Sequence, residues 1–83
     1  MDNQSGVIKK TSILIGEKKY FQAKEILLNF LQNAKNIKID IKVFYNLYLV
    51  SNNLNEFKNA KKFLEKCLKI NDKNHIILNN LGN

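Results

Sequence analysis

The order of apolar and polar positions in residues 41–70 predicts two helices of different character. The helix over residues 41–52 is apolar nearly all the way round, with Phe44, Leu47 and Val50 among its apolar residues, so protein should cover it on more than one side. Residues 56–70 are amphipathic. One face carries Phe57, Ala60, Phe63, Leu64, Cys67, Leu68 and Ile70, and the other carries lysines 58, 62, 66, 69 and 73. We therefore expect a central helix beside an outer helix.

Residues 6–33 predict a second helical pair, with a polar turn at residues 17–19. The apolar face of the helix over residues 6–16 consists of Val7, Ile8, Thr11, Leu14 and Ile15. That of the helix over residues 20–33 consists of Tyr20, Ala23, Ile26, Leu27, Phe30 and Leu31. Asp40 and Asn55 precede the helices that begin near residues 41 and 56, and both residue types are favoured N-caps. A short fifth helix is expected over residues 75–83.

One short pattern occurs twice near the end of the chain. Phe44, Asn46 and Leu47 recur 34 residues later as Leu78, Asn80 and Leu81, which is the period of the tetratricopeptide repeat. Between the two copies lie Phe57 and Ala60, spaced as this family spaces an aromatic residue and an alanine, and then a turn at residues 70–74. The segment resembles the tetratricopeptide repeat family. Tyr48 and Asp72 depart from it, standing where the family usually has a small residue and proline. Tyr20 and Ala23 repeat the aromatic–alanine spacing 37 residues earlier.

The resemblance implies an all-α fold, a right-handed helical repeat (α-α superhelix) of about five antiparallel helices. It places the whole chain, residues 1–83, in a single domain with repeats at about 4–38 and 41–74 and a partial third repeat at 75–83. In this family the first helix of each repeat lines a concave groove. The corresponding residues here are Lys42, Tyr45, Asn46, Leu49, Asn52, Asn53, Asn79, Asn80 and Asn83.

The residue types at these positions suit a protein partner. Tyr45 and Leu49 lie one helical turn apart, and together they offer more apolar surface than one packing face requires. Asparagine amides can bind a peptide backbone and lysines attract carboxylates, so an extended peptide or a partner helix is the expected ligand. The alternative is that Tyr45 and Leu49 pack on the first helix of the chain and leave no groove.

The last predicted helix would lack a partner helix of its own. Its apolar residues are Ile77, Leu78 and Leu81. We expect them to be covered by a second copy of the chain, which would form a homo-oligomer, or by further repeats of a longer array.

The chain is strongly basic, with a net charge of +7, and all 14 basic residues are lysine. The lysines of residues 58–73 form either a solvated outer face or an electrostatic patch for nucleic acid, an anionic membrane or an acidic partner. Lysine supports weak, salt-sensitive binding to polyanions, whereas specific readers of nucleic acid rely on arginine. Because Phe57 and Phe63 are expected to point inward, no exposed aromatic ring would lie among the lysines to stack on bases. An RNA-binding helical repeat is therefore the less favoured alternative function.

Catalysis has little support in this sequence. The single histidine, His75, has no Cys, Asp or Glu at the spacing of a metal site or catalytic triad, and no glycine-rich phosphate loop is present. Cys67 is expected to be a buried, inert thiol. We expect no enzymatic activity, cofactor or metal. No apolar run approaches the roughly 20 residues of a membrane span, and the N-terminus lacks the pattern of a signal peptide, so we expect a cytoplasmic protein without membrane insertion.

Overall fold

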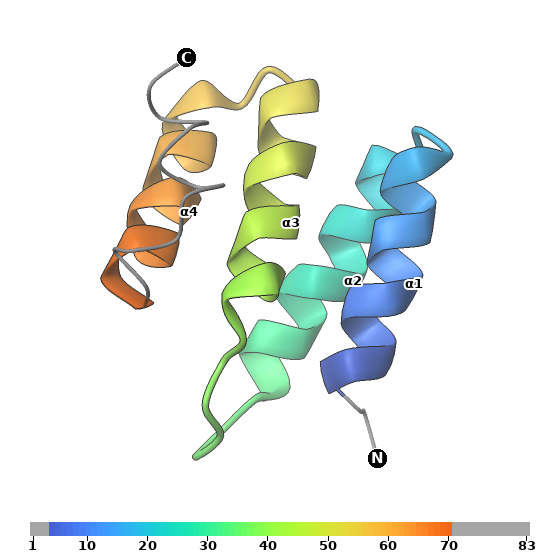
Figure 1. Cartoon of the computed structure of the whole chain (residues 1–83). Coiled ribbons are helices and arrows are strands. Elements are labelled where there is room, and N and C mark those ends of the chain that lie inside the picture. The colour runs from blue at the N-terminus through green and yellow to red at the C-terminus, as the bar shows by residue number, and fades with distance from the viewer. Residues whose placement is uncertain (1–3, 71–83) are drawn as a thin grey trace.

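A computed structural model describes residues 4–70, which form four α-helices and no strand (Figure 1). They are α1 (Gln4–Gly16), α2 (Tyr20–Asn33), α3 (Ile41–Asn53) and α4 (Phe57–Ile70). The all-α class predicted from the sequence is confirmed, and each of these helices lies within two residues of its predicted bounds. The predicted fifth helix lies outside the described residues.

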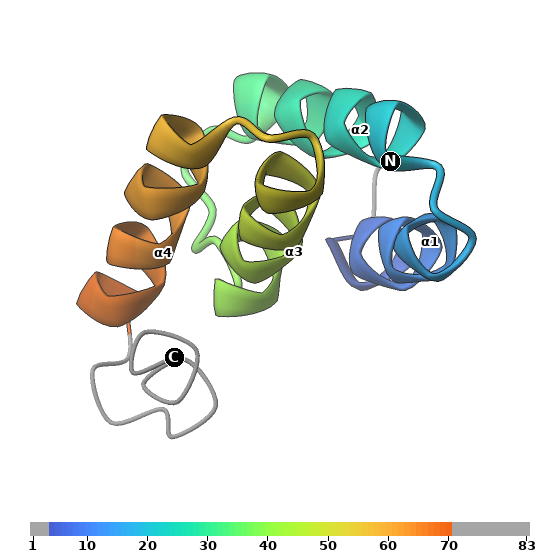
Figure 2. The same ribbon diagram turned by 90° about the horizontal axis from the view of Figure 1, so that it is seen from above.

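The helices form two antiparallel hairpins, α1–α2 and α3–α4, with α3 in the centre (Figure 1). Helix α3 contacts α1, α2 and α4. Seen from the direction of Figure 2, α2 lies across one side of α1 and α3, and α4 lies beside α3. This arrangement confirms the expectation that the mostly apolar α3 is covered on several sides, while the amphipathic α4 is an outer helix.

The second hairpin repeats the first with a shift of 37 residues. Gln4 corresponds to Ile41, Gly16 to Asn53, Tyr20 to Phe57 and Asn33 to Ile70, so both helices of one hairpin start and end where their counterparts do. The buried positions of the second helices follow the same shift: Ala23, Leu27 and Phe30 correspond to Ala60, Leu64 and Cys67. The two hairpins, joined by the connection at residues 34–40, therefore share their helix bounds and the buried positions of their second helices, but not those of their first helices.

The core consists of two clusters of buried side chains. Leu27, Phe30, Val43 and Leu47 join α2 to α3, and Leu64 and Cys67 bind α4 to the other side of α3. The prediction that Phe57 and Ile70 also point inward is wrong, because their side chains are 61% and 41% exposed. These are the first and last residues of α4, and they lie beyond Ala60 and Cys67, the outermost buried positions of the same face.

Two polar side chains fix the start of α3. Asp40 is its N-cap, as predicted, and its Oδ1 accepts a hydrogen bond of 2.9 Å from the backbone N–H of Lys42. The backbone N–H of Asp40 in turn donates to Oε1 of Gln4 at 2.7 Å, while Nε2 of Gln4 donates to the carbonyl of Lys38 at 3.1 Å. Gln4 thus ties the first turn of α1 to the connection between the hairpins.

The first helix of each hairpin ends in the same way. Asn55 has φ 64°, and the backbone N–H of the next residue, Glu56, donates to the carbonyl of Ser51 at 2.8 Å. This is a Schellman motif, in which one left-handed residue satisfies the last carbonyls of a helix. Asn55 therefore terminates α3, and the prediction that it caps α4 is wrong. Lys18 has φ 63° and holds the equivalent place after α1.

Candidate functional site

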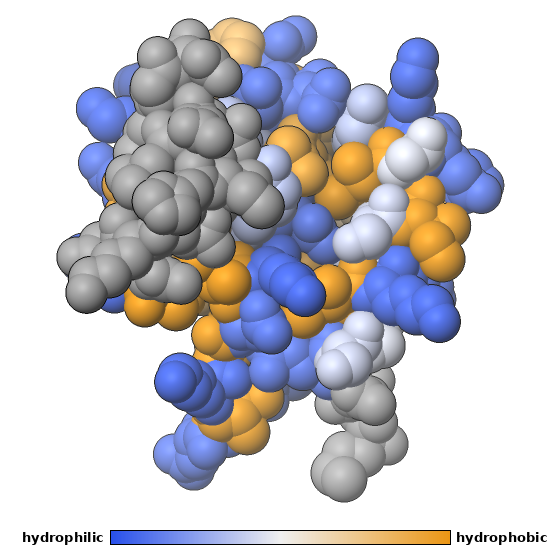
Figure 3. Space-filling view, in the orientation of Figure 1, coloured by the Kyte–Doolittle hydropathy of each residue, from blue (hydrophilic) through white to orange (hydrophobic). Residues whose placement is uncertain are grey.

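One face of α3 is only partly covered by α4. Val43, Leu47 and Val50 are buried on its inner side. The opposite side carries the residues that we call the α3 surface: Lys42, Tyr45, Tyr48, Leu49, Asn52 and Asn53. The lysine and the two asparagines are exposed, and the other three are half-buried. Figure 3 shows apolar patches among polar side chains on the face formed by α1 and α3.

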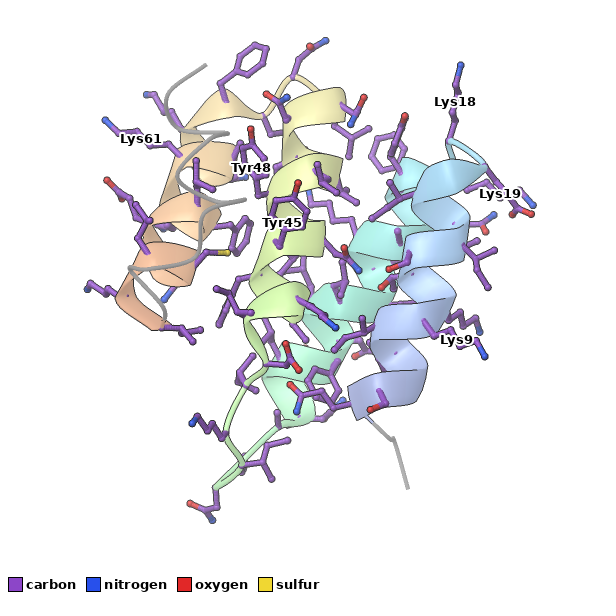
Figure 4. The ribbon with its side chains drawn as sticks, viewed as in Figure 1. Lys9, Lys18, Lys19, Tyr45, Tyr48 and Lys61 are labelled. Atoms are coloured by element: carbon purple, nitrogen blue, oxygen red, sulfur yellow. The ribbon has the colours of Figure 1, made fainter. Side chains whose placement is uncertain are left out.

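A pair of tyrosines forms the centre of the α3 surface. The ring centroids of Tyr45 and Tyr48 are 5.9 Å apart with their planes at 35°, and both rings lie on the same side of α3 (Figure 4). Both pack against the cluster of Leu64 and Cys67 on α4. Tyr45 therefore packs toward α4 and is only partly buried. Sequence reasoning omitted Tyr48, although a residue three places from Tyr45 on a helix is its neighbour.

Asn46 does not belong to this surface. Its side chain is buried, with 6% exposed, and its Nδ2 donates to the hydroxyls of Thr11 and Ser12 at 3.1 Å each. The hydroxyl of Thr11, itself buried, donates onward to the carbonyl of Val7 at 2.7 Å. Asn46 thus fastens α3 to α1, and we remove it from the residues proposed to contact a partner.

The other sequence-predicted residues divide into two sets. Lys42, Asn52 and Asn53 are exposed on α3, and Nδ2 of Asn53 donates to the carbonyl of Leu49 within the helix at 2.7 Å. The second set lies outside the described residues and comprises Asn79, Asn80, Asn83, Ile77, Leu78 and Leu81. The described part of the site therefore comes from α3 alone.

The lysines of α4 lie on its exposed face, as the sequence predicted. Lys58, Lys62 and Lys69 are exposed, and Lys66 places its Nζ 5.7 Å from the ring centroid of Phe44. At this distance a lysine is attracted to the negative face of an aromatic ring. Lys66 therefore shields the ring of Phe44 on the side where α3 and α4 meet.

One ion pair joins the two hairpins. Nζ of Lys24 on α2 lies 2.7 and 2.8 Å from the two carboxylate oxygens of Glu56, the residue before α4. The hydrogen bonds from Lys24 lower the pKa of Glu56 below its ordinary value, because they stabilise the charged carboxylate. This pair fixes the turn between α3 and α4 against α2.

The thiol of Cys67 is buried in the core, as expected. It donates to the carbonyl of Ile41 at 3.7 Å, and burial raises its pKa to about 11 because a thiolate is poorly solvated there. A thiol that stays protonated at neutral pH is a poor nucleophile. Within residues 4–70, no group of three or more His, Cys, Asp or Glu side chains could hold a metal ion.

None of the four described helices is both long enough and apolar enough to cross a bilayer. No family model matches the chain, and searches of curated proteins and of solved structures found no match either.

Proposed function

We propose that this chain is a non-enzymatic helical-repeat module that binds another protein through the α3 surface. The observation that carries the proposal is the partly buried group of Tyr45, Tyr48 and Leu49 on the central helix, beside the exposed Lys42 and Asn52. The resemblance to tetratricopeptide repeats and the 37-residue structural repeat both favour a right-handed array whose first helices line one groove. We further propose that the protein acts in the cytoplasm.

The α3 surface combines rigid apolar area with polar groups at its edge. Because both tyrosine rings already pack on α4, little side-chain freedom is lost when a ligand covers them, which favours affinity. Tyrosine also suits an interface because its ring is apolar and its hydroxyl is polar. Lys42 adds attraction for a carboxylate at one end, and the amides of Asn52 and Asn53 can pair with a peptide backbone. The preferred ligand is an extended peptide or a helix with an apolar side chain and a nearby carboxylate.

The test is selection of peptides from a displayed library, followed by fluorescence anisotropy of the enriched sequences. Tyr45→Ser and Leu49→Ser should each weaken binding by about tenfold or more, since each removes most of a buried apolar side chain from the interface. Leu28→Ser is the matched control, because Leu28 is an exposed leucine on α2 and should leave binding unchanged. Equal effects of Leu49→Ser and Leu28→Ser would reject the α3 surface.

We also propose that the chain self-associates through Ile77, Leu78 and Leu81, or that these residues contact a further repeat. Sedimentation across micromolar concentrations should show an oligomer. Ser substitutions at these three positions should shift the protein to a monomer, and a strictly monomeric folded protein would contradict self-association.

The alternative function is binding of single-stranded RNA. It is favoured by the finding that Phe57, expected inside, is exposed at the start of the lysine-bearing α4, because aromatic rings beside lysines can stack on bases. A salt titration with single-stranded RNA distinguishes this function. Its binding constant would fall steeply as salt rises, whereas the absence of binding at low salt would exclude it.

A further inference from the structure

The two turns within the hairpins lie at the same end of the molecule, at the top of Figure 1. We call this the tip end, formed by residues 17–21 and 54–61. It carries Phe21 and Phe57, which are 71% and 61% exposed and are the two most exposed large hydrophobic side chains of the described residues. Two phenylalanines at one end of a small domain expose apolar surface to water, and such surface commonly marks a binding site.

Both phenylalanines stand in the first turn of their helices. Phe21 is the second residue of α2 and Phe57 is the first residue of α4. Every Cα–Cβ bond in an α-helix tilts toward the helix N-terminus, so side chains of the first turn lean past the start of the helix. The α2 and α4 N-termini both lie at the tip end (Figure 1). The two phenylalanines therefore lie at the same end of the molecule, on separate hairpins.

The same end is positively charged. Lys18, Lys19, Lys58 and Lys61 are all exposed, and in Figure 4 Lys18 extends beyond the turn between α1 and α2. The nearby acids are already engaged. Glu17 lies 3.5 Å from Nζ of Lys19, and the carboxylate of Glu56 is paired with Lys24 on α2. The tip end thus combines two apolar projections with a surplus of lysine.

We propose that the tip end docks on the surface of an anionic phospholipid bilayer. The rings of Phe21 and Phe57 enter the interfacial region, where amphipathic and aromatic groups are stabilised, and the surrounding lysines approach the lipid phosphates. The contact is peripheral and requires no membrane-spanning helix. It uses a different surface from the α3 surface and does not depend on it.

A bilayer fits this end better than a peptide or a nucleic acid strand. The phenylalanines belong to separate hairpins, and neither lines the shallow hollows of the described residues on α2 (Glu25, Ile26, Leu28, Asn29, Gln32) or α4 (Lys62, Glu65, Lys66, Lys69). A peptide needs a groove for its anchors, and a single strand follows a basic groove beside its stacking rings. A fluid lipid surface accepts two projecting rings without a preformed groove.

The first experiment is flotation of the full chain with vesicles of phosphatidylcholine alone or with 30% phosphatidylserine. Binding is expected only to the anionic vesicles and should weaken at high salt. The double variant Phe21→Ser, Phe57→Ser should lower the partition constant by at least about tenfold, because each buried ring contributes substantially. Ile37→Ser is the control, since Ile37 is an exposed apolar residue in the connection at the opposite end of the molecule (Figure 1).

Two double lysine variants distinguish an effect of the tip end from an effect of the net charge of the protein. Lys58→Gln with Lys61→Gln should reduce binding by about thirtyfold, given a contribution of about 1 kcal/mol for each lysine near an anionic surface. Lys35→Gln with Lys38→Gln removes the same charge from the opposite end and should have a much smaller effect. Far-ultraviolet circular dichroism of every variant should be unchanged, because all of these side chains are exposed.

A fluorescence experiment locates the contact directly. The chain contains no tryptophan, so Phe57→Trp gives a single reporter at the tip end and Ile37→Trp a matched reporter at the other end. Anionic vesicles should shift the emission of the first to the blue and leave the second unchanged. The proposal is overturned if anionic vesicles are not bound at low salt, if both lysine pairs act equally, if the phenylalanine variant binds normally, or if only RNA is bound.

Discussion

Replacing Asn46 by alanine distinguishes a structural residue from a binding residue. The substitution removes the hydrogen bonds of 3.1 Å to the hydroxyls of Thr11 and Ser12, each with a net contribution of about 1 kcal/mol, and a longer one of 3.5 Å to the carbonyl of Ile8 that adds little. The space left by the lost amide increases the loss of stability by about 1 kcal/mol, while the better helix propensity of alanine decreases it by about 0.5 kcal/mol. We expect Asn46→Ala to lower the free energy of unfolding by about 2.5 kcal/mol.

The assay is urea denaturation followed by circular dichroism at 222 nm. A loss of this size corresponds to a fall in melting temperature of about 10–20 °C in a domain of this length. Asn53→Ala is the matched control: the same change on the same helix, at an exposed residue whose amide bonds only to the carbonyl of Leu49 among the described residues. It should change stability by less than about 0.5 kcal/mol.

Equal stability of the two asparagine variants would contradict a structural role for Asn46. In that case the contacts of Asn46 with α1 would contribute nothing, and its original assignment to the partner-binding residues would need to be restored. A large loss for Asn46→Ala, with peptide binding by the folded variant retained, would establish its structural role.

Four side chains are the subject of further predictions. Ser51→Ala should raise stability by about 1 kcal/mol in urea denaturation, because the buried hydroxyl has no hydrogen-bond partner in the described structure. Lys18→Gly should raise it by about 0.5 kcal/mol or more in the same assay, since glycine adopts φ 63° without strain. Native Cys67 should react with a thiol reagent at pH 8 at least about 100-fold more slowly than in urea. Its raised pKa also means that stability falls as pH rises from 9.0 to about 11. Glu56→Gln should lower the urea midpoint at pH 7, and the difference from the natural chain should shrink as the pH falls below 4.5, because hydrogen bonds from Lys24 lower the pKa of Glu56 in the fold and the pair stabilises the fold only where Glu56 is ionised.

Periodicity was sufficient to predict the helices and most of their inner faces. The apolar face of residues 20–33 contains Ala23, Leu27 and Phe30, which are the buried residues of α2. Asp40 could be assigned as an N-cap because aspartate directly before a helical apolar run is favoured at that position. These features depend on neighbours within a helix, which sequence spacing reports directly.

Features that depend on distant parts of the chain could not be predicted in the same way. Asn46 is buried because Thr11, 35 residues away, provides a hydroxyl partner, and no local pattern reports this. Phe57 has the helical spacing of a core residue, but it is the first residue of α4, and none of the other described helices buries it. Asn55 was misassigned because asparagine favours both N-caps and left-handed C-terminal positions.

The shift of 37 residues between the hairpins has a consequence for how this architecture tolerates changes in length. An insertion of a whole hairpin between two helices would leave the apolar face of each existing helix intact. An insertion of a few residues within a helix would rotate every later position by about 100° per residue and place apolar side chains in water. Length changes compatible with folding should therefore come in whole hairpins or be confined to residues 34–40.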